Sequence, residues 1–268
     1  MKIYAEAIIT EVVKEMLDMA TVDKLREMNV KVMADKFLWQ REQPGILNLS
    51  FEERFGMLVD AEWLERRGRR ESRLIRQAKF RFPASIEDID YHEKRGITKA
   101  DIIRLSDCLY IKRKQNLIIT GPTGVGKTFI VCALGRCACQ QELAVYYTRM
   151  NDLFLSFEQA HLTNSFALLK KRLLKVPLLI LDDWGIKPFT NIESHEIGEL
   201  VELRYGRAST IISSQVPSTS WHELFPDPTS GEATLDRLIH NAFNYNLSGE
   251  SMRKILAMQQ FAIEPESG

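Results

Sequence analysis

The segment GPTGVGKT, residues 121–128, holds the residues with the most specific chemistry in this sequence. It has the spacing G-x-x-x-x-G-K-T, in which glycines let a loop fold around phosphates with backbone N–H groups pointing inward. The lysine neutralises the β- and γ-phosphates, and the hydroxyl that follows it binds Mg²⁺. A hydrophobic run, NLIIT, precedes the segment and a helical pattern follows it, which is the setting that the motif requires. We therefore predict that ATP and Mg²⁺ are bound by Gly121, Pro122, Thr123, Gly124, Val125, Gly126, Lys127 and Thr128.

A second group of candidate residues ends the hydrophobic run LLILDD, residues 178–183. Asp182 stands where a carboxylate holds Mg²⁺ through its water shell, and Asp183 where a carboxylate polarises the attacking water. Paired acids at the end of a strand can also be merely solvated. Because the same chain carries a phosphate-binding loop, we predict that the two acids complete the ATP site.

Both motifs need a framework that brings the ends of two strands together. Apolar runs at residues 116–120, 143–148, 178–182 and 210–214, with a weaker one at 244–247, alternate with helical patterns at 127–139, 152–160, 165–174 and 193–205. Strands buried on both faces of a parallel sheet are continuously apolar, as LLIL is. The alternation predicts an α/β fold: a parallel sheet with helices on both faces.

The N-terminal part of the chain is predicted to be helical throughout. An apolar stripe at residues 9–20 has helical spacing, and a second helix is expected at 22–38. Ser50 and Glu53 then form a capping box at the start of a long helix. The pattern changes near Phe82 and Pro83. We predict a small all-α domain at residues 1–80 and the α/β domain at residues 81–268.

The second half of the long helix is strongly basic. Residues 66–81 contain eight cations and one acid, so the segment carries +7, and the remainder of a chain with 36 acidic and 36 basic residues carries −7. Like charges packed on a helix cost stability unless an anion offsets them. A DNA-binding surface and a solvated face both fit this pattern. The candidate DNA contacts are Arg66, Arg69, Arg70, Arg73 and Arg76, with a second, weaker cluster of Lys170, Lys171 and Arg172.

Composition excludes several other classes of protein. With 45% hydrophobic residues the chain has the composition of a globular protein with a core. No apolar run approaches the roughly 20 residues needed to cross a bilayer. Glu6, Glu11 and Glu15 interrupt the first apolar stretch, which the core of a signal peptide would not tolerate. We expect a cytoplasmic protein with no membrane partner, in which the four cysteines are buried thiols rather than metal ligands.

Several stretches resemble the IstB-like transposition helper ATPases of insertion sequences, relatives of the DnaC helicase loaders within the AAA+ superfamily. The stretches are SFEERFGMLVDAEW, RLIRQAKFRFPASIEDIDY, GPTGVGKT, LLILDDWG, ELRYGRASTIISSQ and DRLIHNAFNYNLSGESMRK. The resemblance covers nearly the whole chain. It implies an AAA+ P-loop ATPase core, with a reduced lid because 32 residues run from Arg237 to the end of the sequence.

The resemblance also implies roles for three further residues. Gln215 fills the sensor 1 position, where its side chain can bond the γ-phosphate or water. Arg237 resembles the arginine finger that reaches a neighbouring subunit's γ-phosphate, and Arg253 resembles sensor 2. One position departs from the usual pattern, because Asp183 stands where glutamate is more common. Its side chain is one methylene shorter, which predicts slow hydrolysis.

Together these features predict a slow, DNA-stimulated ATPase that forms an ATP-dependent homo-oligomer on double-stranded DNA. Its expected role is to assist a transposase in selecting or remodelling target DNA. The nearest alternative is a DnaC-like replicative helicase loader, which has the same ATPase and a different partner. A small-molecule kinase would need an acceptor pocket that the segments IISSQ and DRLIHN do not suggest. A nucleotide-gated scaffold with negligible turnover is a further alternative, and phosphate release with and without DNA distinguishes it.

Overall fold

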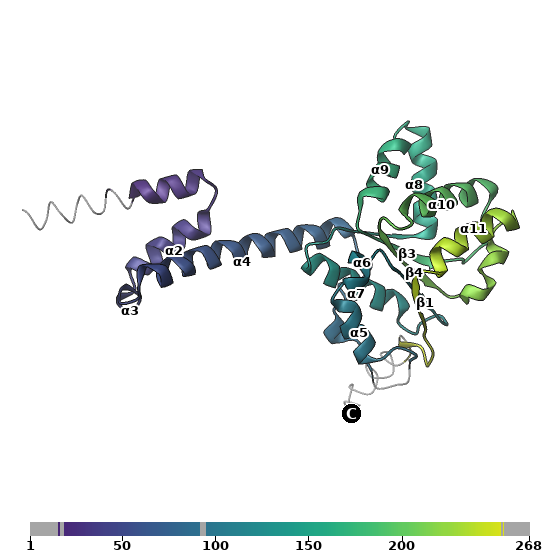
Figure 1. Cartoon of the computed structure of the whole chain (residues 1–268), viewed down its shortest axis with the longest axis horizontal. Coiled ribbons are helices and arrows are strands. Elements are labelled where there is room, and N and C mark those ends of the chain that lie inside the picture. Colours follow the sequence, from purple (N-terminus) through teal and green to yellow (C-terminus); the bar gives the residue numbers. More distant parts are fainter. Residues whose placement is uncertain (1–15, 17–18, 92–94, 253, 255–268) are drawn as a thin grey trace, which may run out of the picture. The chain divides into compact units, whose positions relative to one another are not determined.

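The computed structural model describes residue 16, residues 19–91, residues 95–252 and residue 254. The chain divides into two compact units, Met1–Ser72 and Arg73–Gly268. The division falls inside the long helix α4 (Phe51–Ala78), which is drawn in blue in Figure 1. Most of the apolar stripe predicted at residues 9–20 lies outside the described residues. The two units are taken in turn.

The described part of the first unit is helical, as predicted. It contains a helix that ends at residue 27, α2 (Lys31–Arg41), α3 (Pro44–Leu47) and the larger part of α4. The single helix predicted at residues 22–38 was wrong, because the chain turns at residues 28–30. Asn29 adopts a φ of 59° there, a left-handed conformation that asparagine tolerates better than most residues. The Ser50–Glu53 capping box is confirmed by two reciprocal hydrogen bonds of 2.8 and 3.2 Å.

A five-stranded parallel sheet forms the centre of the second unit. Its strands are β1 (Asn116–Thr120), β2 (Val145–Arg149), β3 (Leu178–Trp184), β4 (Ser209–Ser214) and β5 (Ala242–Asn246). They lie in the order β2-β3-β4-β1-β5. All five predicted strands are confirmed within a few residues. Because the strands are parallel, the residues that follow β1, β3 and β4 meet at one edge of the sheet.

Helices cover both faces of this sheet (Figure 1). Leu117, Ile119 and Ile180 face one core, which α5 (Lys99–Ser106), α6 (Leu109–Lys112), α7 (Lys127–Gln140) and the end of α4 complete. Ile118 and Leu179 face a second core, built with α8 (Met150–Leu162), α9 (Phe166–Lys175), α10 (Asn191–Arg204) and α11 (Pro228–Ile239). Successive strand residues therefore enter different cores, which explains their continuous apolar character.

Two short 3₁₀ helices, η1 (Ile86–Asp88) and η2 (Ser218–Leu224), complete the second unit. Among the described residues, no helix is both long enough and apolar enough to pass through a bilayer. The four cysteines are buried and form no disulfide. Burial raises the pKa of Cys132 and Cys137 to about 11 and that of Cys108 to about 12, so these thiols stay protonated and unreactive at neutral pH.

Candidate nucleotide-binding site

The predicted phosphate-binding loop connects β1 to α7. Gly121 has a φ of 144° and Gly124 a φ of 90°, conformations that side chains rarely adopt. Space is also restricted, because a Cβ on Gly121 would lie 2.4 Å from the Leu247 carbonyl oxygen. α7 begins at Lys127, so its positive N-terminal end points toward the loop. The local sequence thus builds a backbone cradle suited to phosphate.

Lys127 is held within this loop and is 7% exposed. Its Nζ donates hydrogen bonds of 2.7 Å to the carbonyl oxygens of Gly121 and Pro122. An ammonium group enclosed by the loop is placed to neutralise an anion bound in the same cradle. Its position agrees with the role predicted for it, and the role itself stays a prediction.

Asp182 lies at the centre of a hydrogen-bonded network and is fully buried. Its Oδ1 accepts hydrogen bonds from the hydroxyls of Thr128, at 3.2 Å, and Ser213, at 2.6 Å. Its Oδ2 accepts a 2.7 Å bond from the hydroxyl of Tyr147. Burial, together with the nearby Asp182 carboxylate, raises the pKa of Tyr147, which therefore remains a hydrogen-bond donor. The network orients Asp182 toward Thr128.

The pair Thr128 and Asp182 fits Mg²⁺. The Thr128 hydroxyl donates a 3.2 Å hydrogen bond to Oδ1 of Asp182, which leaves a lone pair of the hydroxyl oxygen free to bind the ion. The Asp182 carboxylate would accept hydrogen bonds from the water molecules of the Mg²⁺ shell. The described residues contain no group of three or more His, Cys, Asp or Glu side chains able to hold a metal. Mg²⁺ does not need one, because it commonly takes one or two protein oxygens and completes its shell with water and substrate phosphates.

Asp183 adopts a left-handed backbone conformation with a φ of 59°. Aspartate is among the few residues other than glycine that tolerate this region, so the conformation favours aspartate over the longer glutamate. Its carboxylate oxygen Oδ2 accepts a 3.1 Å hydrogen bond from Nε of Arg149 and lies 3.7 Å from Nη1 of Arg81. The predicted water-polarising carboxylate is therefore held by two arginines that the motifs did not indicate.

Gln215 lies beside the phosphate-binding loop. It directly follows β4, which is hydrogen-bonded to β1 with Ser214 opposite Thr120. The hydroxyl of Thr123 donates a 2.6 Å hydrogen bond to Oε1 of Gln215. The fold thus brings Gln215 and the loop together, although 92 residues separate Gln215 from Thr123 in the sequence.

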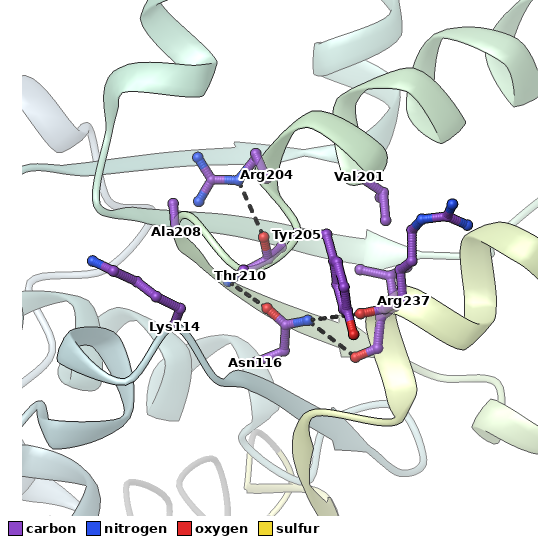
Figure 2. Close-up of a pocket in the computed structure, with 10 residues that line it drawn as sticks. Lys114, Asn116, Val201, Arg204, Tyr205, Ala208, Thr210 and Arg237 are labelled. Carbon is purple, nitrogen blue, oxygen red and sulfur yellow. Dashed lines mark hydrogen bonds between the residues drawn. The ribbon is translucent and has the colours of Figure 1, made fainter.

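Arg237 lies at the opposite edge of the sheet, where it lines a small pocket at the starts of β1 and β4 (Figure 2). The side chain of Asn116, the first residue of β1, donates a 3.1 Å hydrogen bond to the carbonyl of Leu238 and fixes the end of α11 there. A strand of five residues spans about 13 Å, which is longer than an arginine side chain. Arg237 is therefore remote from the loop of its own chain. Its guanidinium instead pairs with Glu202 at 2.7 Å.

Arg253, the predicted sensor 2 residue, lies outside the described residues. The segment before it contacts the loop, because the backbone N–H of Met252 donates a 2.9 Å hydrogen bond to the carbonyl of Gly124. The assignment of Arg253 stays a prediction.

The predicted DNA contacts of the first unit are partly engaged in holding that unit together. Arg66 donates from Nε to Glu62 at 2.7 Å and from Nη2 to the carbonyl of Asn29 at 3.1 Å. Arg69 pairs with Glu65 at 2.5 Å. Sequence reasoning counted charges only from residue 66 onward and missed both acids. Their i, i+4 spacing from the arginines was the available signal.

The predicted DNA contacts of the second unit differ in exposure. Arg73 and Arg76 of α4 are exposed. On α9, Lys170 is ion-paired with Glu199, and Arg172 stacks on the ring of Tyr146 with 4.8 Å to the ring centroid. Lys171, beside them, is exposed. The end of α4 therefore presents cations with fewer internal partners than α9 does.

A parallel sheet with this strand order, a phosphate-binding loop after β1 and two acids in β3 define a P-loop ATP-binding protein of the AAA+ class. Solved structures of two such proteins have the same fold. The DnaC helicase loader matches 64% of this chain and all of its own, with a TM-score of 0.53 and 17% identity. AMPPCP-bound DnaA from Aquifex aeolicus matches 70% of this chain and 58% of its own, with a TM-score of 0.55 and 17% identity.

The chain belongs to the family of IstB-like ATP binding proteins, which it matches over residues 23–259. The insertion sequence ATP-binding protein y4pL of Sinorhizobium fredii is 42% identical over 239 residues. That alignment covers 89% of this chain and 98% of the relative. The resemblance noted in the sequence is thereby confirmed at the level of the family and its ATP-binding domain.

Proposed function

We propose that this chain is an ATPase that binds double-stranded DNA and assists the transposase of an insertion sequence in selecting or remodelling its target. The observation that carries the proposal is the convergence of Lys127, Thr128, Asp182 and Asp183 at one edge of the sheet, in a chain whose family is that of insertion sequence ATP-binding proteins.

The loop backbone and three side chains divide the binding of ATP among them. The loop and Lys127 hold the phosphates, and Thr128 and Asp182 hold the metal. When bound, Mg²⁺ neutralises charge on the phosphate oxygens. Tyr147 and Ser213 keep Asp182 turned toward Thr128 through their hydrogen bonds. We expect this arrangement to position the triphosphate before any chemistry.

Hydrolysis then requires a polarised water. Asp183 accepts a proton as the water oxygen bonds to the γ-phosphorus, and the bond from that phosphorus to the β–γ bridging oxygen breaks with its electron pair left on ADP. The proton passes on to the released phosphate. Gln215 orients the water or γ-phosphate from its place beside Thr123. Arg237, remote from its own loop, supplies positive charge to the γ-phosphate of a neighbouring copy, so activity depends on a homo-oligomer formed on DNA.

The partner is tested by reconstitution. Purified protein should release phosphate from ATP slowly, faster with duplex DNA, and should raise strand transfer by the transposase encoded in the same element only when ATP is present. The alternative is a DnaC-like loader. This chain shares the fold of the DnaC helicase loader, but an identity of 17% shows the fold alone. Stimulated loading of a replicative helicase, with no effect on the transposase, would favour the loader. ATP binding without phosphate release would favour the third hypothesis, a nucleotide-gated scaffold with negligible turnover.

A further inference from the structure

The backbone on either side of Gln215 is held by buried groups. The hydroxyl of Ser214, which is fully buried, donates a 2.8 Å hydrogen bond to the carbonyl of Trp184 and accepts a 3.0 Å bond from the backbone N–H of Val216. The indole N–H of the buried Trp221 donates a 3.0 Å bond to the carbonyl of Val216. Gln215 therefore leaves the sheet on a firm support, and its exposed side chain is the part that can change direction.

The loop residue that contacts this side chain is also restrained. Pro122 precedes Thr123, and its ring keeps its own backbone φ near about −65°. Gly124 follows, and its carbonyl accepts a 2.9 Å hydrogen bond from the backbone N–H of Met252. Threonine is branched at Cβ, which limits rotation about χ1. The hydroxyl of Thr123 therefore has a defined position, although this side chain is exposed.

The contact between the two side chains sets the direction of the Gln215 amide. The hydroxyl of Thr123 donates a 2.6 Å hydrogen bond to Oε1 of Gln215. A glutamine amide carries one acceptor oxygen and an NH₂ group with two donors, and both belong to one planar group. Fixing the oxygen on Thr123 therefore also fixes the direction of the donors. The amide turns its N–H groups, and not its carbonyl oxygen, away from Thr123.

A fixed pair of N–H donors beside a phosphate-binding loop suits the terminal phosphate of ATP. Phosphate oxygens are charged and can only accept hydrogen bonds, so they bind an N–H donor strongly. With the amide reversed, the carbonyl oxygen of Gln215 would face the phosphate and repel it. ADP has no γ-phosphate and gains nothing from this donor. The orientation of the amide can therefore change the affinity for ATP relative to that for ADP.

We propose that Thr123 is a positioning residue through which this chain distinguishes ATP from ADP. Its hydroxyl holds the amide of Gln215 with Nε2 available to the γ-phosphate before the nucleotide arrives. The inference rests on the proposed function, in which Gln215 bonds the γ-phosphate or water, and it assigns the amide donor to the phosphate.

The test is the ratio of two affinities, for a non-hydrolysable ATP analogue and for ADP, both measured with Mg²⁺ by competition against a fluorescent ADP. In Thr123→Val, which keeps the shape and branching of the side chain, the phosphate must order the amide by itself. Ordering one such side chain costs affinity by a factor of about two to ten. The ratio should fall by that factor, because only the analogue needs the ordered amide. Thr123→Ser retains the hydroxyl and should restore most of the ratio.

A double-variant cycle tests whether Thr123 acts through Gln215. Gln215→Leu removes the amide and should lower the ratio by about tenfold or more, the usual loss for a hydrogen bond to a charged group. Thr123→Val combined with Gln215→Leu should lower the ratio no further than Gln215→Leu alone. The matched control is Thr163→Val. It removes the hydroxyl of another exposed threonine, which donates a 2.8 Å hydrogen bond to the carbonyl of Gln159, and it should leave the ratio at the wild-type value.

Several results would overturn the proposal. Equal losses of affinity for ADP and for the analogue in Thr123→Val would mean that the hydroxyl supports the loop itself. Additive effects in the double variant, or a ratio as low in Thr123→Ser as in Thr123→Val, would mean that Thr123 does not act by holding Gln215. A wild-type ratio in Gln215→Leu would remove the contact with the γ-phosphate. All of these measurements concern binding, so a wild type that shows the expected ratios and releases no phosphate would refute the proposed ATPase and leave the role of Thr123 intact.

Discussion

Replacing Arg73 and Arg76 together with glutamine tests whether the exposed cations at the end of α4 bind DNA. For each DNA phosphate that the protein no longer neutralises, the dependence of log affinity on log salt becomes shallower by about 0.9. Both side chains are exposed, so removing the two charges should change the slope by about 1.8. Between 50 and 200 mM salt, the wild type should then lose about tenfold more affinity than the variant. Glutamine retains helix propensity, so α4 should persist.

The assay is titration of labelled duplexes by fluorescence anisotropy at four or more salt concentrations. Two unrelated sequences should show the same change, because phosphate contacts carry no base information. Arg113→Gln with Arg207→Gln is the matched control: both arginines are exposed in the second unit, and the change in charge is identical. An unchanged slope in the Arg73/Arg76 variant, or an equal change in the control, would refute a DNA-binding role for the end of α4.

Arg66 is unsuitable for that test, although it belongs to the same basic segment. It pairs with Glu62, whose other carboxylate oxygen accepts the backbone N–H groups of Val32 and Met33 at 3.0 and 3.1 Å. Glu62 therefore caps α2, whose N-cap residue Val30 provides no side-chain cap of its own. Arg66→Gln should lower the free energy of unfolding by about 1 kcal/mol. A loss of DNA affinity in this variant would not identify a phosphate contact.

Three further outcomes follow from the geometry of the site and the α2 cap. Lys127→Ala should abolish binding of a fluorescent ATP analogue. Asp183→Asn should retain this binding and lose on the order of 100-fold in turnover. Equal loss of binding in the two variants would contradict the role of Asp183. Arg237→Ala mixed with Lys127→Ala should regain ATPase activity, and no recovery between subunits shown to exchange would exclude action in trans. Burial raises the pKa of Glu62, but hydrogen bonds from Arg66 and the backbone outweigh it, so the pKa lies below its usual 4.5. The wild type should have a higher denaturant midpoint than Glu62→Gln, and this difference should be complete above about pH 5 and disappear as the pH falls through the lowered pKa. A difference that grows on acidification would refute the role of Glu62 as the cap of α2.

The phosphate-binding loop and the two acids could be recognised from the sequence because each is a contiguous segment whose chemistry depends on its own spacing. Strand positions were also predictable, since burial on both faces leaves runs such as LLIL with no polar residue. Family resemblance singled out Gln215, which the fold brings beside the loop, and its sensor 1 role stays a prediction. It did not reveal why aspartate occupies position 183, which follows from the backbone φ of 59° there.

Only the tertiary structure decided which side chains surround those motifs. Tyr147 and Ser213 orient Asp182 from two different strands, and Arg81 and Arg149 hold Asp183 from sequence positions 102 and 34 residues away (183 − 81 and 183 − 149). No local pattern that contains these four residues indicates that they contact Asp182 or Asp183. Parallel strands joined by long crossovers bring residues from distant segments to one edge of the sheet. The spacing of these residues along the chain therefore does not predict which side chains come into contact.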